Sequence, residues 1–96
     1  MSKYELMIIV NAALTQEERE KIFTEATDTV VKSGGKLINS QVWLEKNKLA
    51  FIMKKATHGT YYLITFESPS SSISKIRQVL KMNEGILRFL IVNVKG

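Results

Sequence analysis

The sequence predicts an α+β fold in which the elements follow the order β-α-β-β-α-β. Stretches rich in β-branched and aromatic residues, many with a period of two, alternate with amphipathic stretches whose apolar residues recur every three to four positions. Short connections and right-handed crossovers then favour the ferredoxin-like split βαβ arrangement, a four-stranded antiparallel sheet with two helices on one face. With 96 residues we expect a single ferredoxin-like domain covering residues 1–96.

The first strand and the first helix are predicted ahead of the glycines at 34–35. Residues 3–10 are apolar on both faces from Leu6 onward, which is typical of an interior strand. Thr15 and Glu18 have the spacing of a capping box, in which each side chain accepts a hydrogen bond from the other residue's backbone N–H. The apolar stripe of the helix that follows consists of Ile22, Phe23, Ala26 and Val30. The two glycines end this helix, because glycine readily adopts the left-handed conformation that closes a helix.

Two long extended runs, residues 36–55 and 59–67, form the centre of the predicted sheet. The alternation places four side chains on one face of the first run: Ile38, Ser40, Val42 and Leu44. The polar residues 45–48 are either a bend within one strand or a hairpin turn, and we expect a bend because a second hairpin would leave no room for the crossover. We expect the turn at residues 56–59, which contain a glycine.

Pro69 and the serines at 70–72 announce the second helix, and we interpret the serines as redundant caps. Its apolar stripe consists of Ile73, Ile76, Val79 and Leu80. Residues 86–94 form the last strand, apolar on both faces apart from Arg88 and Asn93. Helices cover only one side of such a sheet, so we expect a partner to cover the open face or an edge.

Composition narrows the classes of function. Fourteen Lys and Arg against nine Asp and Glu give a net charge of +5, which favours a polyanion as partner. The chain has no cysteine, so disulfides and thiolate metal sites are excluded, and we expect a cytoplasmic protein. The apolar run 6–14 is too short to span a bilayer as a helix, and Glu5 and Asn11 argue against a signal peptide.

The sequence holds little that could perform chemistry. His58 is the only histidine, falls in the predicted turn and has no neighbouring carboxylate, so we interpret it as a solvated loop residue. The clustered serines have no base nearby in the sequence, and the connection at 11–14 lacks the arginine of the acylphosphatase phosphate loop. We therefore expect no enzyme activity, no catalytic residue, no metal site, no cofactor and no small-molecule substrate.

Basic and aromatic residues alternate along the central strands, as RNA binding requires: charge for phosphates and rings for unstacked bases. Four lysines lie within ten residues: Lys46, Lys48, Lys54 and Lys55. They could equally protect an exposed edge strand from pairing with another chain. The stretch 58–66 is loosely similar to the aromatic segment of RNA-recognition-motif proteins. An RNA-recognition-like, ligand-binding or protein-interaction module on the same fold thus stays open as the alternative.

One set of residues resembles a known family over essentially the whole chain. The set comprises Tyr4-Glu5, Trp43, Lys48-Leu49-Ala50-Phe51, Lys55, Gly59 with Tyr61-Tyr62, and Glu67 with Pro69. In this order and spacing they are similar to the bacterial small-subunit ribosomal protein number six family. The resemblance implies a structural component of the small ribosomal subunit, on the ribosome in the cytoplasm. It would bind the central domain of small-subunit ribosomal RNA together with small ribosomal protein number eighteen.

The resemblance also implies RNA-facing residues. By position, Lys3, Lys55 and Arg88 would contact phosphates, whereas Tyr4 and Phe51 would either stack on RNA or pack within the protein. The basic cluster adds Lys48 and Lys54 as RNA-binding candidates. The chain departs from the family's common pattern at Leu44, Glu45, Asn47 and Ile52, where relatives commonly carry a glycine, a basic pair and a proline.

Overall fold

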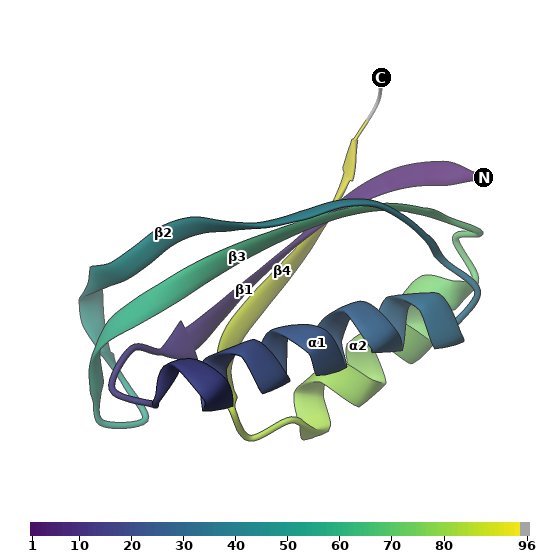
Figure 1. The fold of residues 1–96 in the computed structure, drawn as a ribbon. Helices are drawn as coiled ribbons and strands as arrows, with labels where there is room; N and C mark the ends of the chain where they lie inside the picture. Colours follow the sequence, from purple (N-terminus) through teal and green to yellow (C-terminus); the bar gives the residue numbers. More distant parts are fainter. Residues whose placement is uncertain (95–96) are drawn as a thin grey trace.

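The predicted order β-α-β-β-α-β is confirmed in a computed structural model that describes residues 1–94 (Figure 1). The elements are β1 (Ser2–Asn11), α1 (Gln16–Lys32), β2 (Lys36–Met53), β3 (Ala56–Ser68), α2 (Ser72–Met82) and β4 (Ile86–Val94). The strands form one antiparallel sheet in the order β2-β3-β1-β4. Both helices lie on the same face of this sheet, as Figure 1 shows. The ferredoxin-like fold class is therefore confirmed.

The main core fills the space between the helices and the sheet. Its fully buried members from the sheet include Leu6, Ile8, Val10, Ile64 and Phe66, and those from the helices include Ala26, Val30 and Ile76. Both predicted stripes contribute, but Phe23 and Ile73 are only half-buried and Val79 is 37% exposed. Truncating a side chain such as Leu6 to alanine typically costs about 2–5 kcal/mol, so the central strands carry much of the stability.

The ends of α1 follow the predicted chemistry. The Glu18 N–H donates to Thr15 Oγ1 and the Thr15 N–H donates to Glu18 Oε1, both at 3.2 Å, so the capping box is confirmed. At the other end Gly34 adopts a φ of +99°, and the N–H groups of Gly34 and Gly35 donate to the carbonyls of Val31 and Val30. These two bonds satisfy carbonyls that the helix leaves free.

The prediction that serines cap α2 is wrong. Ser71 occupies the N-cap position but makes no side-chain cap hydrogen bond, because its backbone is already helical (φ −63°, ψ −22°) instead of extended. The start of α2 is held by backbone bonds, from the Ser72 N–H to the Pro69 carbonyl and from the Ile73 N–H to the Ser70 carbonyl.

The central hairpin confirms one prediction and corrects another. β2 runs unbroken through residues 45–48, where a register shift and the positive φ of Lys46 (47°) produce the expected bend. The turn does not lie at 56–59: it consists of Lys54 and Lys55, both left-handed (φ 46° and 67°), and β3 begins at Ala56. His58 therefore lies in a strand. The glycine that suggested the turn serves packing instead, because a Cβ on Gly59 would lie 2.6 Å from Ile9 Cγ2.

The predicted alternation along β2 is also wrong, first at Ile38, which is the extra residue of a bulge between Leu37 and Asn39. Val42 pairs with Tyr62, which faces the helices, whereas Leu44 pairs with Tyr61 on the open face. Trp43 is the extra residue of a second bulge, between Val42 and Leu44, and each extra residue moves the side chains that follow it to the other face, up to the next register shift.

The open face of the sheet is partly covered by the chain itself. A second core of Ile9, Leu49 and Ala56 forms on this face where the end of the β2–β3 hairpin bends over it. Four half-buried residues pack against it: Met7, Met53, Tyr61 and Leu87. Elsewhere large apolar side chains remain exposed, among them Leu90 and Val92 on β4. The expectation of a covering partner stays a prediction for this remaining surface.

Candidate nucleic-acid interface

The two helices differ in charge: α1 is mainly acidic and α2 is basic. Five of the nine acidic residues lie on α1, whereas α2 carries three cations and no carboxylate. α1 packs under β2, β3 and β1, whereas α2 packs under β4. The β4 side of the molecule is therefore basic, and a polyanion is attracted to that side.

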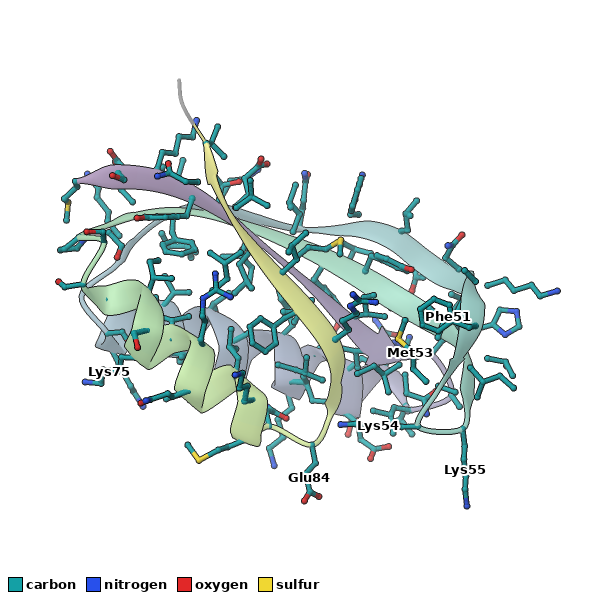
Figure 2. All side chains as sticks on the ribbon, turned by 180° about the vertical axis from the view of Figure 1, so that it is seen from behind. Phe51, Met53, Lys54, Lys55, Lys75 and Glu84 are labelled. Carbon is teal, nitrogen blue, oxygen red and sulfur yellow. The ribbon has the colours of Figure 1, made fainter. Side chains whose placement is uncertain are left out.

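The turn of the central hairpin directs its two lysines differently. Lys54 bends toward the start of β4, where its Nζ donates to the Ile86 carbonyl at 3.4 Å. Lys55 points away from the body of the protein (Figure 2). Lys55 also borders a hollow of about 340 Å³ with Lys46, His58 and residues 11–13, and no carboxylate lines it. Two neighbouring residues of the turn thus present charge to two sides of the hairpin end.

The structure brings most of the predicted basic residues together at one end of the sheet. Arg88 pairs with Ile9 near the end of β1 and lines a hollow together with Lys54. Lys48 is exposed and pairs with His58 in β3, close to the turn. Lys3 is the exception, because it lies near the start of β1, about 26 Å along the strand from the hairpin end. Lys3 therefore cannot share a local phosphate site with the other four.

The two aromatic candidates have opposite environments. Tyr4 is only 6% exposed and its ring stacks on Phe66 with centroids 5.6 Å apart, so it packs in the core. Of the two roles left open for Tyr4, the structure therefore shows packing within the protein. Phe51 is 60% exposed and lies near the hairpin end (Figure 2), where its ring is free to stack on another molecule.

Arg19 is a residue that the sequence reasoning missed. It is buried on α1, and its Nη1 donates to the carbonyls of Ala12 at 3.1 Å and Leu14 at 2.7 Å, while its Nη2 lies 3.8 Å from Glu45 Oε1. Arg19 therefore ties the β1–α1 connection to the bend of β2. Its position three residues before Ile22 places it on the apolar stripe, and this spacing could have revealed it.

Arg19 also influences a neighbouring ionisable group. Burial raises the pKa of the Tyr62 hydroxyl, while the hydrogen bond and positive charge of Arg19 act in the opposite direction.

Within residues 1–94, no three His, Asp or Glu side chains are grouped so that they could hold a metal ion. In the same part of the chain, neither helix has the length and apolar character needed to cross a bilayer.

Comparison with known proteins defines the class of protein to which this chain belongs. Residues 3–93 match the family model described as ribosomal protein S6. The small ribosomal subunit protein bS6 of Thermoanaerobacter pseudethanolicus is 34% identical over 92 residues, covering 96% of each chain. That of Campylobacter lari is 36% identical over 96 residues, covering all of this chain and 77% of the relative. The crystal structure of ribosomal protein S6 from Thermotoga maritima superposes with a TM-score of 0.84 over 97% of this chain and 87% of that one, at 23% identity, which supports the fold.

These matches identify a protein of the small ribosomal subunit. Within that class, the chain belongs to the ribosomal protein S6 family.

Proposed function

We propose that the protein binds the central domain of small-subunit ribosomal RNA together with small ribosomal protein number eighteen, as a non-catalytic part of the bacterial ribosome in the cytoplasm. In this role it works as one domain, residues 1–96, without a cofactor or a small-molecule substrate. The observation that carries the proposal is the group of exposed cations at the hairpin end and on β4: Lys48, Lys54, Lys55 and Arg88. The only ion pair within residues 1–94 joins Arg19 to Glu45, so these four charges are available to phosphates.

The proposed RNA contacts follow from each residue's surroundings. The exposed lysines and Arg88 anchor phosphates, which positions the protein without reading sequence. The exposed ring of Phe51 stacks on an unpaired base. Lys3 contacts a separate phosphate at the other end of the sheet, where its side chain is exposed.

The proposed protein partner occupies the exposed apolar surface of the β2 edge. Trp43 (53% exposed), Leu44 (41%) and Ile52 (69%) lie on this edge strand. An isolated chain leaves this apolar area in water, so a partner that buries it gains free energy. Binding of the partner would also stabilise the curved hairpin that carries the RNA-facing lysines, which couples the two events.

The experiment measures the affinity of the purified protein for a central-domain RNA fragment as salt is varied, with and without small ribosomal protein number eighteen. We expect affinity to fall steeply with salt, and to be much higher when the protein partner is present. Equal affinity with and without the partner would contradict the paired mechanism. Failure to sediment with small subunits at low salt would instead favour an interaction or ligand-binding module.

A further inference from the structure

Four cations surround one hollow between α2, β4 and the hairpin turn. Lys54 comes from the turn, Arg77 and Lys81 from α2, and Arg88 from β4. We call these four residues the α2–β4 cluster. The hollow has a volume of about 380 Å³, and its remaining lining is apolar: Leu80, Ile86, Leu87 and Phe89. Its lining thus contains no carboxylate and no side-chain hydrogen-bond acceptor.

Local structure explains only part of this concentration of charge: Lys81 lies in the last turn of α2, where a cation complements the helix dipole. Arg77 and Lys81 are four residues apart on α2, so their like charges repel each other on one face of the helix. None of the four forms an ion pair in the described part of the chain. Charged residues on edge strands can prevent unwanted pairing, which would explain Arg88 on β4. That explanation does not apply to Arg77 and Lys81, because a helix has no unpaired strand edge that needs protection.

The geometry suits phosphate groups. All four cations are exposed, and an apolar lining of this kind can support the aliphatic stems of long side chains while their charged ends stay in solvent. Arginine binds phosphate through two parallel N–H bonds, and lysine contributes a compact point charge. Lys54 is already oriented by its bond to the Ile86 carbonyl, which lowers the entropy lost when it engages a ligand.

We infer that the α2–β4 cluster binds backbone phosphates of structured RNA, so that Arg77 and Lys81 extend the RNA-binding surface from the hairpin end and β4 onto helix α2. The inference rests on the proposed function, and it adds two residues and one element to it. An RNA backbone fits better than an acidic protein segment, because the chain belongs to a ribosomal family and the side chains that line the hollow include four cations and no hydrogen-bond acceptor.

The test compares two double variants that each remove two positive charges from exposed helix positions. R77Q/K81Q removes the α2 half of the cluster. K32Q/K75Q is the matched control, because Lys32 and Lys75 are exposed on the two helices and line a different hollow (Figure 2 labels Lys75). Affinity for the central-domain RNA fragment is measured with small ribosomal protein number eighteen present, from about 50 to 300 mM salt.

Counterion release sets the expected size of the loss in RNA affinity. Each phosphate contact contributes about one unit to the slope of log affinity against log salt, hence roughly a factor of ten at 0.1 M. R77Q/K81Q should therefore weaken binding about 10- to 100-fold at 0.1 M salt and lower the slope by about 1–2 units. K32Q/K75Q should change affinity by less than about 3-fold through its effect on net charge alone. R77K/K81R keeps both charges and should retain most of the slope.

The outcomes separate this inference from the proposed function. If the wild-type protein binds RNA with the expected salt dependence and R77Q/K81Q matches K32Q/K75Q, the inference is overturned and the proposed function stands. If the wild-type protein shows no salt-dependent RNA binding, both fail. If R77Q/K81Q loses affinity for the protein partner without RNA but keeps its RNA affinity, the surface binds protein and the inference is wrong. Far-UV circular dichroism checks the fold, and equal losses in folded R77K/K81R and R77Q/K81Q would also overturn a charge-based role.

Discussion

Replacing Gly59 by alanine tests whether this glycine exists for packing. A Cβ there would lie 2.6 Å from Ile9 Cγ2 and 3.1 Å from Leu49 Cδ2, both in the second core. Ile9 is only 3% exposed and its β-branched side chain is stiff, so β1 or the hairpin end must move. Overpacking of this kind costs about 1–3 kcal/mol. Alanine restricts the unfolded chain more than glycine, which offsets about 0.4–1 kcal/mol of this cost. The middle of both ranges gives a net loss of roughly 1.3 kcal/mol.

A double-mutant cycle separates the steric cause from others. Ile9→Ala removes the atom that Cβ would strike, so Gly59→Ala should cost about 1 kcal/mol less in that background. Gly34→Ala is the control: its cost arises from a φ of +99°, and its Cβ would meet only Ser72 Oγ at 3.5 Å, so Ile9→Ala should leave that cost unchanged. Urea unfolding followed by Trp43 fluorescence gives all the free energies. A Gly59→Ala protein as stable as wild type, or additive effects with Ile9→Ala, would refute the packing role.

Three further predictions address the cap, the buried tyrosine and the exposed ring. Thr15→Ala should lower the free energy of unfolding by about 1 kcal/mol in urea because it removes half of the capping box, and an unchanged midpoint would contradict this. Folded Tyr62 has a raised pKa, so its contribution to stability is present below its ordinary pKa of 10.0 and is lost as pH rises through the folded value. Tyr62→Phe should therefore lose less stability than the wild-type protein between about pH 8 and pH 10.5, and an equal loss would argue against this. Phe51→Ala should weaken RNA binding by about 1–3 kcal/mol while changing stability by less than about 0.5 kcal/mol, and a large loss of stability would assign Phe51 to packing.

Local signals in the sequence predicted the elements well where one residue performs one role. Thr15 with Glu18 starts α1 and the glycines at 34–35 end it, as expected. The turn lies elsewhere than predicted because Gly59 looks like a turn residue in the sequence. Its actual role is close packing against Ile9 and Leu49, which come from other parts of the chain. A two-residue turn of left-handed lysines has no sequence signature, since asparagine and glycine normally occupy such positions.

The surface was harder to predict than the fold, because it depends on which elements meet. Lys54 and Arg88 are far apart in sequence, and only the bend of the hairpin over the sheet brings them to one hollow. Arg77 and Lys81 lie on a helix that the sequence pattern defines only through its apolar stripe, so the pattern gives their charges no neighbour. For Tyr4, the family pattern leaves both stacking on RNA and packing open, and its register opposite Phe66 decides for the core.

The strand order gives the proposed function a physical consequence. β2 and β4 are the two edges of the sheet, so the apolar edge at Trp43 and the α2–β4 cluster lie on opposite sides of the molecule. A protein partner at Trp43 and Leu44 and RNA at the α2–β4 cluster can therefore bind at the same time. The two bound molecules approach each other near the hairpin end, where Ile52 of the partner surface follows Phe51 of the RNA surface. The hairpin is the element common to both, since it begins in the β2 edge and ends with Lys54 bonded to Ile86 at the start of β4. A partner that fixes the curvature of β2 therefore also fixes the position of Lys54, and a coupling of about 1–3 kcal/mol between the two binding events requires no other route through the protein.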